Sequence, residues 1–284
     1  MVFVKIRKWL GNGSGVNNLV FRGMGFGDFF SQSRKAAKVQ RLTSRLCGFA
    51  CHHWLIFPDL RYMQPEIIFE DAQLIVMNKP AGIAVEADRF GHPGVQGWVA
   101  AYFDGRKMPS NTIIGIVHRI DRPVSGVVLM AKKKSVLVHL NEQFATGTVK
   151  KVYYAAVDGT PAKPEGKLEH FLMKDTEQKK AVIIPKKGKR GAAVSLSYKT
   201  LHTDKGITLL EVRPHTGKYH QIRAQLGAIG CPIIGDALYG SKRSFLQDAI
   251  LLHAASLTCI HPATNEEVTF NAPVPSSWPI NLPD

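Results

Sequence analysis

The stretch VKKVYYAAVDG, residues 149–159, constrains the fold more than any other part of the chain. Successive side chains of a β-strand point to opposite faces of its sheet, which places Tyr153 and Ala155 on one face. Tyr154 and Ala156 then fall on the other face. Both faces are apolar or aromatic, so a strand of this kind must be covered on both sides. We therefore expect a central, buried strand in a large sheet.

From Met63 onward, the sequence pattern is typical of a folded domain with many short strands. Runs rich in β-branched residues alternate with turn-forming residues. We expect strands at 66–71, 74–79, 113–120, 127–132, 206–217 and two or three more within 251–275. The segment 179–201 predicts a hairpin that carries six lysines and arginines between 179 and 190.

Few helices accompany these strands. Val136, Leu140 and Phe144 recur at helical spacing, and the pattern predicts a short helix with Ser135 as its N-terminal cap and Gly147 at its end. Strands outnumber helices, and most are joined by turns of hairpin length. The sequence thus predicts an α+β fold with a large mixed, mostly antiparallel sheet and flanking helices.

Positive charge is concentrated near the N-terminus. The chain of 284 residues has a formal net charge of +15, and residues 1–62 hold ten basic residues against two acidic ones. We expect this segment to be disordered and the folded domain to span 63–284. Three explanations stay open for 1–62: an organellar transit peptide, a basic arm for nucleic acid, or a gene-model artefact with translation beginning at Met63. The overall charge favours a polyanionic partner.

The four cysteines give no sign of a disulfide framework or a zinc site. They stand at 47, 51, 231 and 259, without a C-x-x-C pair. No uninterrupted apolar run is long enough to span a membrane. We expect a soluble protein of a reducing compartment, the cytoplasm, that does not bind membranes.

The segment HRIDRPVSG, residues 118–126, presents one carboxylate among cationic neighbours. Asp121 follows an apolar run, lies next to Arg122, and precedes a Pro-x-Ser-Gly turn. A carboxylate held there can act as a nucleophile or base. Asp121 can equally cap the turn through its own backbone amides. The spacing alone does not separate these two interpretations.

A second group of polar residues lies in RPHTGKYHQIRAQLGAIGCPIIGDALYG, residues 213–240. Thr216 and Gly217 are expected to start a helix, with Arg223 near its first turn, where free amides favour an anion. His215 and His220 have the wrong spacing and lack a nearby third ligand for zinc. We expect no metal here.

Five segments together resemble RluA-type pseudouridine synthases. HRIDRPVSGVVLMAK is similar to the H-R-L-D-x-x-T-S-G-L-L-x-x-A-K signature of that family. The other four are NKPAG, KVYYAAVDG, HTGKYHQIRAQLGAIGCPIIGDALYG and LLHAASLTCIHP, and all occur in the family's order. The resemblance covers 63–284 and implies the pseudouridine synthase fold, with a central basic catalytic cleft.

The resemblance also implies roles for individual residues. Asp121 matches the catalytic aspartate, which bonds covalently to the target uridine at the base or at the ribose, two possibilities that stay open. Tyr153 matches the active-site tyrosine, and Arg223 the arginine that pairs with the aspartate. Arg119 matches the arginine that fills the gap left by the flipped nucleotide, and Ile222 the apolar wall of the uracil pocket.

Further contacts with the substrate are expected from Lys79, His118 and Lys218. Lys218 stands where the family commonly has arginine, which keeps the charge but loses the bidentate geometry. The resemblance implies an isomerase, an intramolecular transferase that needs no cofactor. We expect a monomer that binds ribosomal or transfer RNA partly through the basic residues of 179–190. The alternative function is a catalytically silent RNA-binding protein on the same fold.

Overall fold

The computed structural model of the protein describes residues 64–87, 94–185 and 191–279. All of them belong to one compact unit, Trp54–Asp284, of the two into which the chain divides. The expected disordered extension at 1–62 and its boundary at Met63 lie outside the described residues. So does the part of the basic segment at 186–190.

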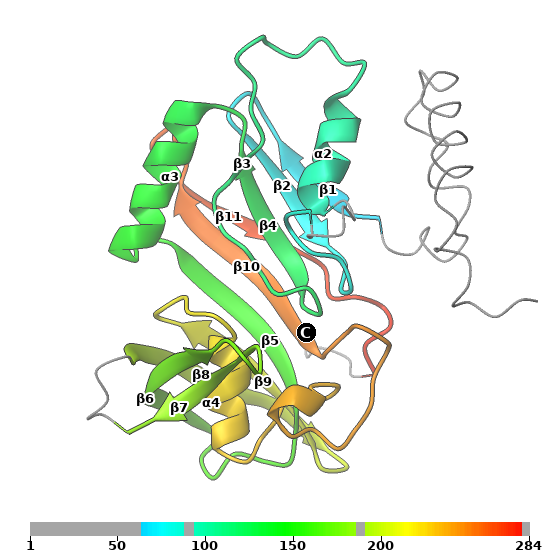
Figure 1. Ribbon diagram of the computed structural model, residues 1–284, viewed down its shortest axis with the longest axis vertical. Helices are drawn as coiled ribbons and strands as arrows, with labels where there is room; N and C mark the ends of the chain where they lie inside the picture. The colour runs from blue at the N-terminus through cyan, green and yellow to red at the C-terminus, as the bar shows by residue number, and fades with distance from the viewer. Residues whose placement is uncertain (1–63, 88–93, 186–190, 280–284) are drawn as a thin grey trace, which may run out of the picture. The chain divides into compact units, whose positions relative to one another are not determined.

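Eleven strands of the described residues form one sheet (Figure 1). They are β1 (Glu66–Glu70), β2 (Leu74–Lys79), β3 (Gly115–Ile116), β4 (Ser125–Ala131), β5 (Lys150–Asp158), β6 (Glu165–Asp175), β7 (Lys180–Ile184), β8 (Ala192–Asp204), β9 (Ile207–Pro214), β10 (Leu252–Ile260) and β11 (Glu267–Asn271). Their order is β1-β2-β4-β10-β5-β9-β8-β6-β7, and β3 pairs with β4 and β11 with β10. Only β4 and β10 pair in parallel. The expected mixed, mostly antiparallel sheet is confirmed.

Strand β5 has the central position that its sequence predicts. It pairs with β10 along one edge and with β9 along the other. Ala155, Ala156 and Val157 are fully buried, so both faces of its second half are covered. Its first half carries Tyr153, which packs against the largest hydrophobic cluster.

Two helices cover opposite faces of the sheet at β2 and β4. Alternate side chains of these strands enter two different clusters, as the two-residue period of a strand requires. Met77 shares one cluster with Val99 of α2 (Val95–Phe103), and Val76 shares the other with Leu140 of α3 (Lys134–Thr146).

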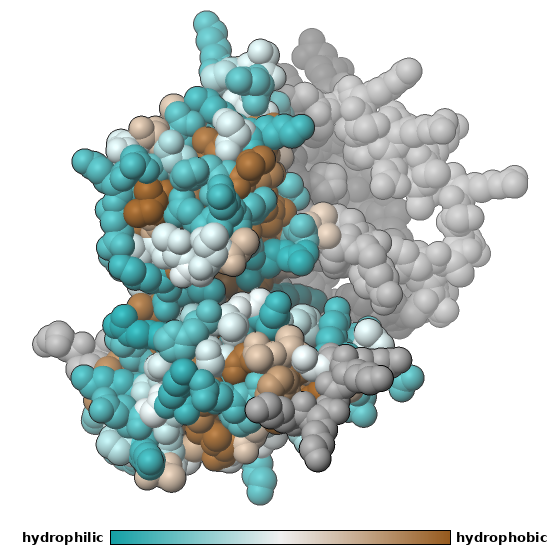
Figure 2. Space-filling model, turned by 90° about the vertical axis from the view of Figure 1, so that its left-hand side faces the viewer, coloured by the Kyte–Doolittle hydropathy of each residue, from teal (hydrophilic) through white to brown (hydrophobic). Residues whose placement is uncertain are grey.

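The molecular surface that Figure 2 shows is largely hydrophilic, with hydrophobic side chains in small separate patches. Among the described residues, no helix has the length and apolar character needed to cross a membrane.

The helix boundaries correct two expectations. Lys133, not Ser135, is the N-cap residue of α3, and no side chain caps this end. Gly147 ends the helix in the left-handed conformation, as predicted. Helix α4 (Gln221–Ala228) begins only after His220, whose positive φ of 51° interrupts a helix starting at Thr216 or Gly217.

The strand pairing corrects two more. The hairpin expected at 179–201 is wrong, because β6 lies between β7 and β8 and pairs with both. The strand expected at 113–120 is only two residues long. Beyond Ile116, the imidazole Nε2 of His118 accepts a hydrogen bond of 3.0 Å from the Leu129 N–H of β4, in place of a strand carbonyl.

The contact between β4 and β10 sets where the loop before β4 can lie. Gly126 has a φ of +118°, and a Cβ atom there would overlap the backbone of Ala254, including its nitrogen at 2.6 Å. Beside it, the buried Ser125 Oγ and His253 Nδ1 are 2.8 Å apart, while His253 Nε2 lies 3.1 Å from the Ala272 carbonyl oxygen. Glycine is required here because the two backbones approach too closely for any side chain.

Gly126→Ala should therefore lower the free energy of unfolding by about 3 kcal/mol or more, since it combines backbone strain with overlap. Gly105→Ala is the matched control, because Gly105 also has a positive φ of +74° but no atom within 4 Å of the added Cβ. Gly105→Ala should lower the free energy of unfolding by only about 1–2 kcal/mol. Urea unfolding of the two variants measures both values, and equal losses would contradict the prediction.

Candidate active site

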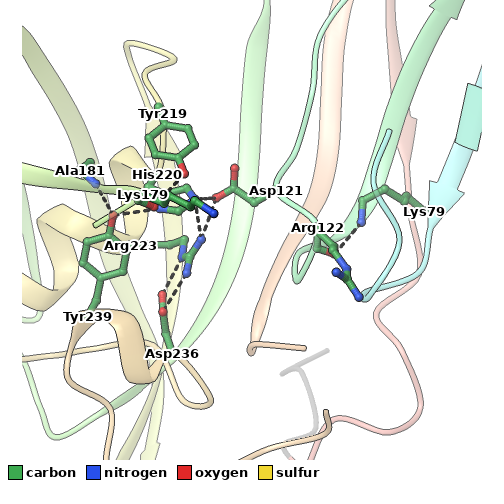
Figure 3. A network of polar contacts seen from close by, with 10 residues as sticks. All are labelled: Lys79, Asp121, Arg122, Lys179, Ala181, Tyr219, His220, Arg223, Asp236 and Tyr239. Carbon is green, nitrogen blue, oxygen red and sulfur yellow. Dashed lines mark hydrogen bonds and ion pairs between the residues drawn. The ribbon is translucent and has the colours of Figure 1, made fainter. Parts of the chain in front are cut away.

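Asp121 lies in the loop that leads into β4. Its neighbours Ile120 and Val124 are buried in the largest hydrophobic cluster, whereas the Asp121 side chain keeps 27% of its surface exposed. The turn is closed by the backbone, since the Val124 N–H donates to the Asp121 carbonyl at 3.0 Å. The Asp121 carboxylate instead faces residues of α4 (Figure 3). The geometry thus favours a presented carboxylate over a turn cap.

Arg223 joins Asp121 to a second carboxylate. Its Nη1 donates to Asp121 Oδ2 at 3.2 Å, and its Nε and Nη2 donate to the two oxygens of Asp236 at 2.7 and 2.9 Å. The side chains of Arg223 and Asp236 are only 7% and 1% exposed. Burial acts to lower the pKa of Arg223, but its bonds to Asp236 and the charge of Asp121 raise it overall. The guanidinium is thus a fixed cation that orients the Asp121 carboxylate.

His220 is the second contact of the Asp121 carboxylate. Its Nε2 lies 3.6 Å from Asp121 Oδ2 and 2.9 Å from Arg223 Nη1. Its Nδ1 lies 3.0 Å from the Tyr239 hydroxyl, which accepts the Ala181 N–H of β7 at 2.7 Å. Burial lowers the pKa of His220, although Asp121 acts in the opposite direction. These contacts connect the end of β7 to the carboxylate.

Tyr153 and Ile222 supply the apolar side of the site. Tyr153 on β5 stands opposite Val212 of β9 and Ala254 of β10, and it packs against the same cluster that contains the buried Ile222. Burial, with a further contribution from the charge of Asp121, raises the pKa of Tyr153. A partly buried aromatic ring and an aliphatic wall therefore belong to one cluster, and the charge of the Asp121 carboxylate acts on that ring, which is a suitable environment for a flat, apolar-faced base.

The comparisons with known proteins show which family the chain belongs to. A protein family described as RNA pseudouridylate synthase matches residues 73–228, more than half of the chain. The chain belongs to this family. It is an RNA pseudouridine synthase, and hence an isomerase.

Individual proteins that are similar to this chain support its assignment to the family. An uncharacterized RNA pseudouridine synthase of Zymomonas mobilis is 34% identical over 216 residues, which are 75% of this chain and 94% of the relative. Ribosomal large subunit pseudouridine synthase C of Buchnera aphidicola is 36% identical over 218 residues, 73% of this chain and 67% of that protein. The structure of human RNA pseudouridylate synthase domain containing 4 shares the fold, with a TM-score of 0.62 at 21% identity over 74% of this chain and 89% of that one.

Lys79 has a different role from the expected contact with the substrate. Its side chain is 0% exposed, and its ammonium donates to the carbonyl oxygens of Pro80, Ile83 and Arg122 at 3.0, 2.8 and 3.2 Å. An ammonium has three donors, and all three are used. Burial lowers the pKa of Lys79 to about 7, against the opposing charge of Asp121. In this synthase Lys79 fixes the loop that carries Asp121 from the side away from Arg223 (Figure 3).

His118 is likewise placed in a structural contact. Its ring stacks on Phe144 of α3 at 5.1 Å between centroids, and its Nε2 accepts the Leu129 N–H. Burial, with a smaller effect of Lys151, lowers the pKa of His118 to about 3. These contacts engage one nitrogen and one face of the ring, and the expected contact of His118 with substrate stays a prediction.

Two expected substrate contacts stand at the exposed rim. Arg119 is exposed and forms an ion pair of 2.7 Å with Glu86. Lys218 is also exposed, and its hydrogen bonds are made by its backbone: its N–H donates to Gln221 Oε1 at 3.1 Å, and its carbonyl oxygen accepts the Gln221 N–H at 3.0 Å. Both cations are accessible, so the prediction that they contact RNA is compatible with their positions.

The sequence reasoning left His220, Asp236 and Tyr239 without a role. All three lie in the same motif as Arg223, and this was the signal that could have identified them. From the sequence alone, His220 is a candidate only for metal binding, and Asp236 is one residue of the motif with no assigned role. Their contacts with Arg223 and with one another become visible only once α4 and the following turn, which includes the 3₁₀ helix η3 (Ala237–Tyr239), are folded together.

His118→Gln should weaken the dependence of stability on acid. The folded-state pKa of about 3 lies below the ordinary 6.5, so as pH falls below 6.5 the unfolded chain takes up a proton that the folded protein excludes. Because of His118, the free energy of unfolding should fall by up to about 1.4 kcal/mol for each pH unit between pH 6.5 and 3. Glutamine can accept the same N–H and does not titrate.

Urea unfolding at pH 7.5, 6, 5 and 4.5 checks this prediction. Below pH 6.5, the free energy of unfolding of the wild type should fall more steeply with decreasing pH than that of His118→Gln. The difference between the two proteins should therefore change from its value at pH 7.5. Equal slopes across the acid range would contradict it.

Proposed function

We propose that this synthase forms pseudouridine in ribosomal RNA of the large subunit, with Asp121 as its catalytic carboxylate. The observation that carries the proposal is the partly exposed Asp121 carboxylate, which Arg223 holds at 3.2 Å and whose charge raises the pKa of Tyr153. The name of the Buchnera relative supports the choice of RNA. Transfer RNA, which the sequence resemblance also allows, is the other candidate substrate.

The proposed chemistry rearranges one nucleotide without an external reactant. Asp121 attacks the target uridine, at the base or at the ribose. The bond between N1 and C1′ breaks, C5 then bonds to C1′, and the proton on C5 leaves while N1 gains one. Atoms and electrons balance, and the Asp121 carboxylate is regenerated. Burial raises the pKa of Tyr153, so its hydroxyl stays protonated at neutral pH and its ring is available to stack on the uracil.

Access to a stacked uridine requires base flipping, and Arg119 is the proposed substitute for the displaced base. Its ion pair with Glu86 is exposed on both sides, and such a pair contributes only about 0–1 kcal/mol. Contact with RNA can therefore replace it at small cost. Lysines on the described part of the basic segment and near it add to the proposed phosphate contacts: Lys174, Lys179, Lys180 and Lys218.

The alternative of a silent RNA-binding protein predicts binding without conversion. The presence of Asp121, Tyr153 and Arg223 together in one site favours an active enzyme over the silent protein. A monomeric state and a cytoplasmic location stay predictions.

Asp121→Asn should reduce pseudouridine formation by at least about 10³-fold, because the amide removes the nucleophile. RNA affinity should change by no more than a few fold, since size and shape are retained. The assay uses an unmodified transcript of large-subunit ribosomal RNA, with pseudouridine mapped by carbodiimide labelling and RNA affinity measured by filter binding. Unmodified transfer RNA is assayed in parallel.

Asp204→Asn is the matched control, because Asp204 is an exposed carboxylate whose ion pair of 3.7 Å is with its neighbour Lys205. It should retain wild-type turnover. Conversion by Asp121→Asn at the wild-type rate would overturn the role of Asp121. Binding without any conversion by the wild type, in either RNA, would instead favour the silent protein.

Arg223→Lys should lower kcat at least about tenfold even though it keeps the positive charge. A lysine makes a point contact and cannot bridge both Asp236 oxygens while reaching Asp121. Single-turnover kinetics with saturating enzyme measure the effect, and thermal unfolding monitors the fold. The control is Arg213→Lys, an exposed arginine paired with Glu211. Equal rates for Arg223→Lys and wild type would show that the bidentate contact is dispensable.

A further inference from the structure

Tyr219 presents an aromatic ring at the rim of the active site. Four large hydrophobic or aromatic side chains are exposed among the described residues: Val138, Tyr219, Leu238 and Leu246. Tyr219 is the one aromatic residue of this group, and 38% of its surface is accessible. It directly precedes His220, the residue that contacts the Asp121 carboxylate.

The ring of Tyr219 is held in one orientation. It stacks on the imidazole of His220 with centroids 3.8 Å apart and planes inclined by 17°. Its hydroxyl donates to the Lys179 carbonyl oxygen at 2.9 Å, at the end of the turn between β6 and β7. That turn is itself ordered by Asp175, whose Oδ1 accepts the N–H groups of Glu177 and Gln178. A fixed ring loses little conformational entropy when it binds a partner.

The position of the ring relative to Asp121 follows from His220. The imidazole on which Tyr219 stacks lies with its Nε2 3.6 Å from Asp121 Oδ2. Figure 3 shows Tyr219 above His220, with Asp121 next to them at the centre of the network. A nucleotide bound at Asp121 would therefore bring the adjoining part of its strand to Tyr219.

One cationic side chain lies over the ring, and two more belong to neighbouring residues. Lys174 Nζ lies 4.6 Å from the ring centroid, and the neighbouring Lys218 and Lys179 are exposed. Lys174 is an exposed, flexible side chain, so a base can displace it from the ring while its ammonium moves to a phosphate. An exposed aromatic ring with lysines on neighbouring residues is suited to binding unpaired nucleotides by stacking and charge.

We propose that Tyr219 stacks on the base of a nucleotide that flanks the target uridine, and so positions the RNA strand for Asp121. This role is separate from that of Tyr153, which faces the flipped uracil itself, and it rests on the proposed function. The ring would act through binding of the strand, without sequence preference, since every base has a stacking face. A rival explanation is that the hydroxyl merely tethers the β6–β7 turn through Lys179.

Two substitutions separate these explanations. Tyr219→Leu removes the aromatic face but keeps apolar bulk, and it should raise KM for the unmodified ribosomal RNA transcript roughly 5- to 100-fold. Single-turnover kcat at saturating RNA should stay within about threefold. Tyr219→Phe keeps the ring and removes the hydroxyl, so it should restore KM to within about twofold of wild type. Tyr219→Thr serves as a second non-aromatic variant, and thermal unfolding monitors the fold of each.

Val138→Ala is the matched control, because Val138 is an exposed apolar residue on α3, and it should leave both constants unchanged. A rise in KM for leucine and threonine with rescue by phenylalanine supports stacking. An equal rise for phenylalanine and leucine would assign the effect to the Lys179 tether and overturn the proposal, as would an unchanged KM for all variants. Absence of pseudouridine with wild-type enzyme would instead contradict the proposed substrate, so the two failures are distinguishable.

Discussion

A guanidinium placed between two carboxylates holds the site together. Asp236 is almost completely buried, and a buried carboxylate without a partner costs several kcal/mol. The bidentate contact from Arg223 offsets that cost and fixes the plane of the guanidinium, which leaves Nη1 directed at Asp121. Helix α4 and the turn before η3 therefore have to dock together before the Asp121 carboxylate has a defined orientation.

The loop that carries Asp121 is held independently of Arg223. Lys79 binds the Arg122 carbonyl from β2, and the close backbone approach at Gly126 fixes β4 against β10. The Asp121 carboxylate is thus supported from two sides. Its own loop is attached to β2, β4 and β10, and its partner Arg223 lies on helix α4, which packs beside β6 and β7. Rigid support on both sides is what a catalytic group needs, because a displacement of about 1 Å can cost 10²-fold in rate.

Periodicity predicted β1, β2, β4, β5 and β9 to within a few residues, but it did not predict β6, and it failed where pairing depends on distant segments. The alternation of β5 identified a central strand, yet β7 and β8 share β6 rather than each other, which no local pattern reveals. For the site, resemblance located Asp121, Tyr153 and Arg223, but residue type did not disclose burial. A motif lysine can bind a phosphate or, as with Lys79, be enclosed by carbonyls; only the fold distinguishes these cases.

The raised pKa of Tyr153 bears on how the proposed reaction loses its C5 proton. A phenol whose pKa lies above its ordinary range is almost entirely protonated near neutral pH, so very little phenolate is present to accept a proton, and general bases work best when their pKa is near the working pH. Stacking and hydrogen bonding are therefore the better-suited tasks for Tyr153. The Asp121 carboxylate, regenerated when its bond to the nucleotide breaks, is held by Arg223 and acts electrostatically on the Tyr153 hydroxyl. On the proposed chemistry, one carboxylate can serve first as nucleophile and then as proton acceptor, with the tyrosine keeping the uracil face against it.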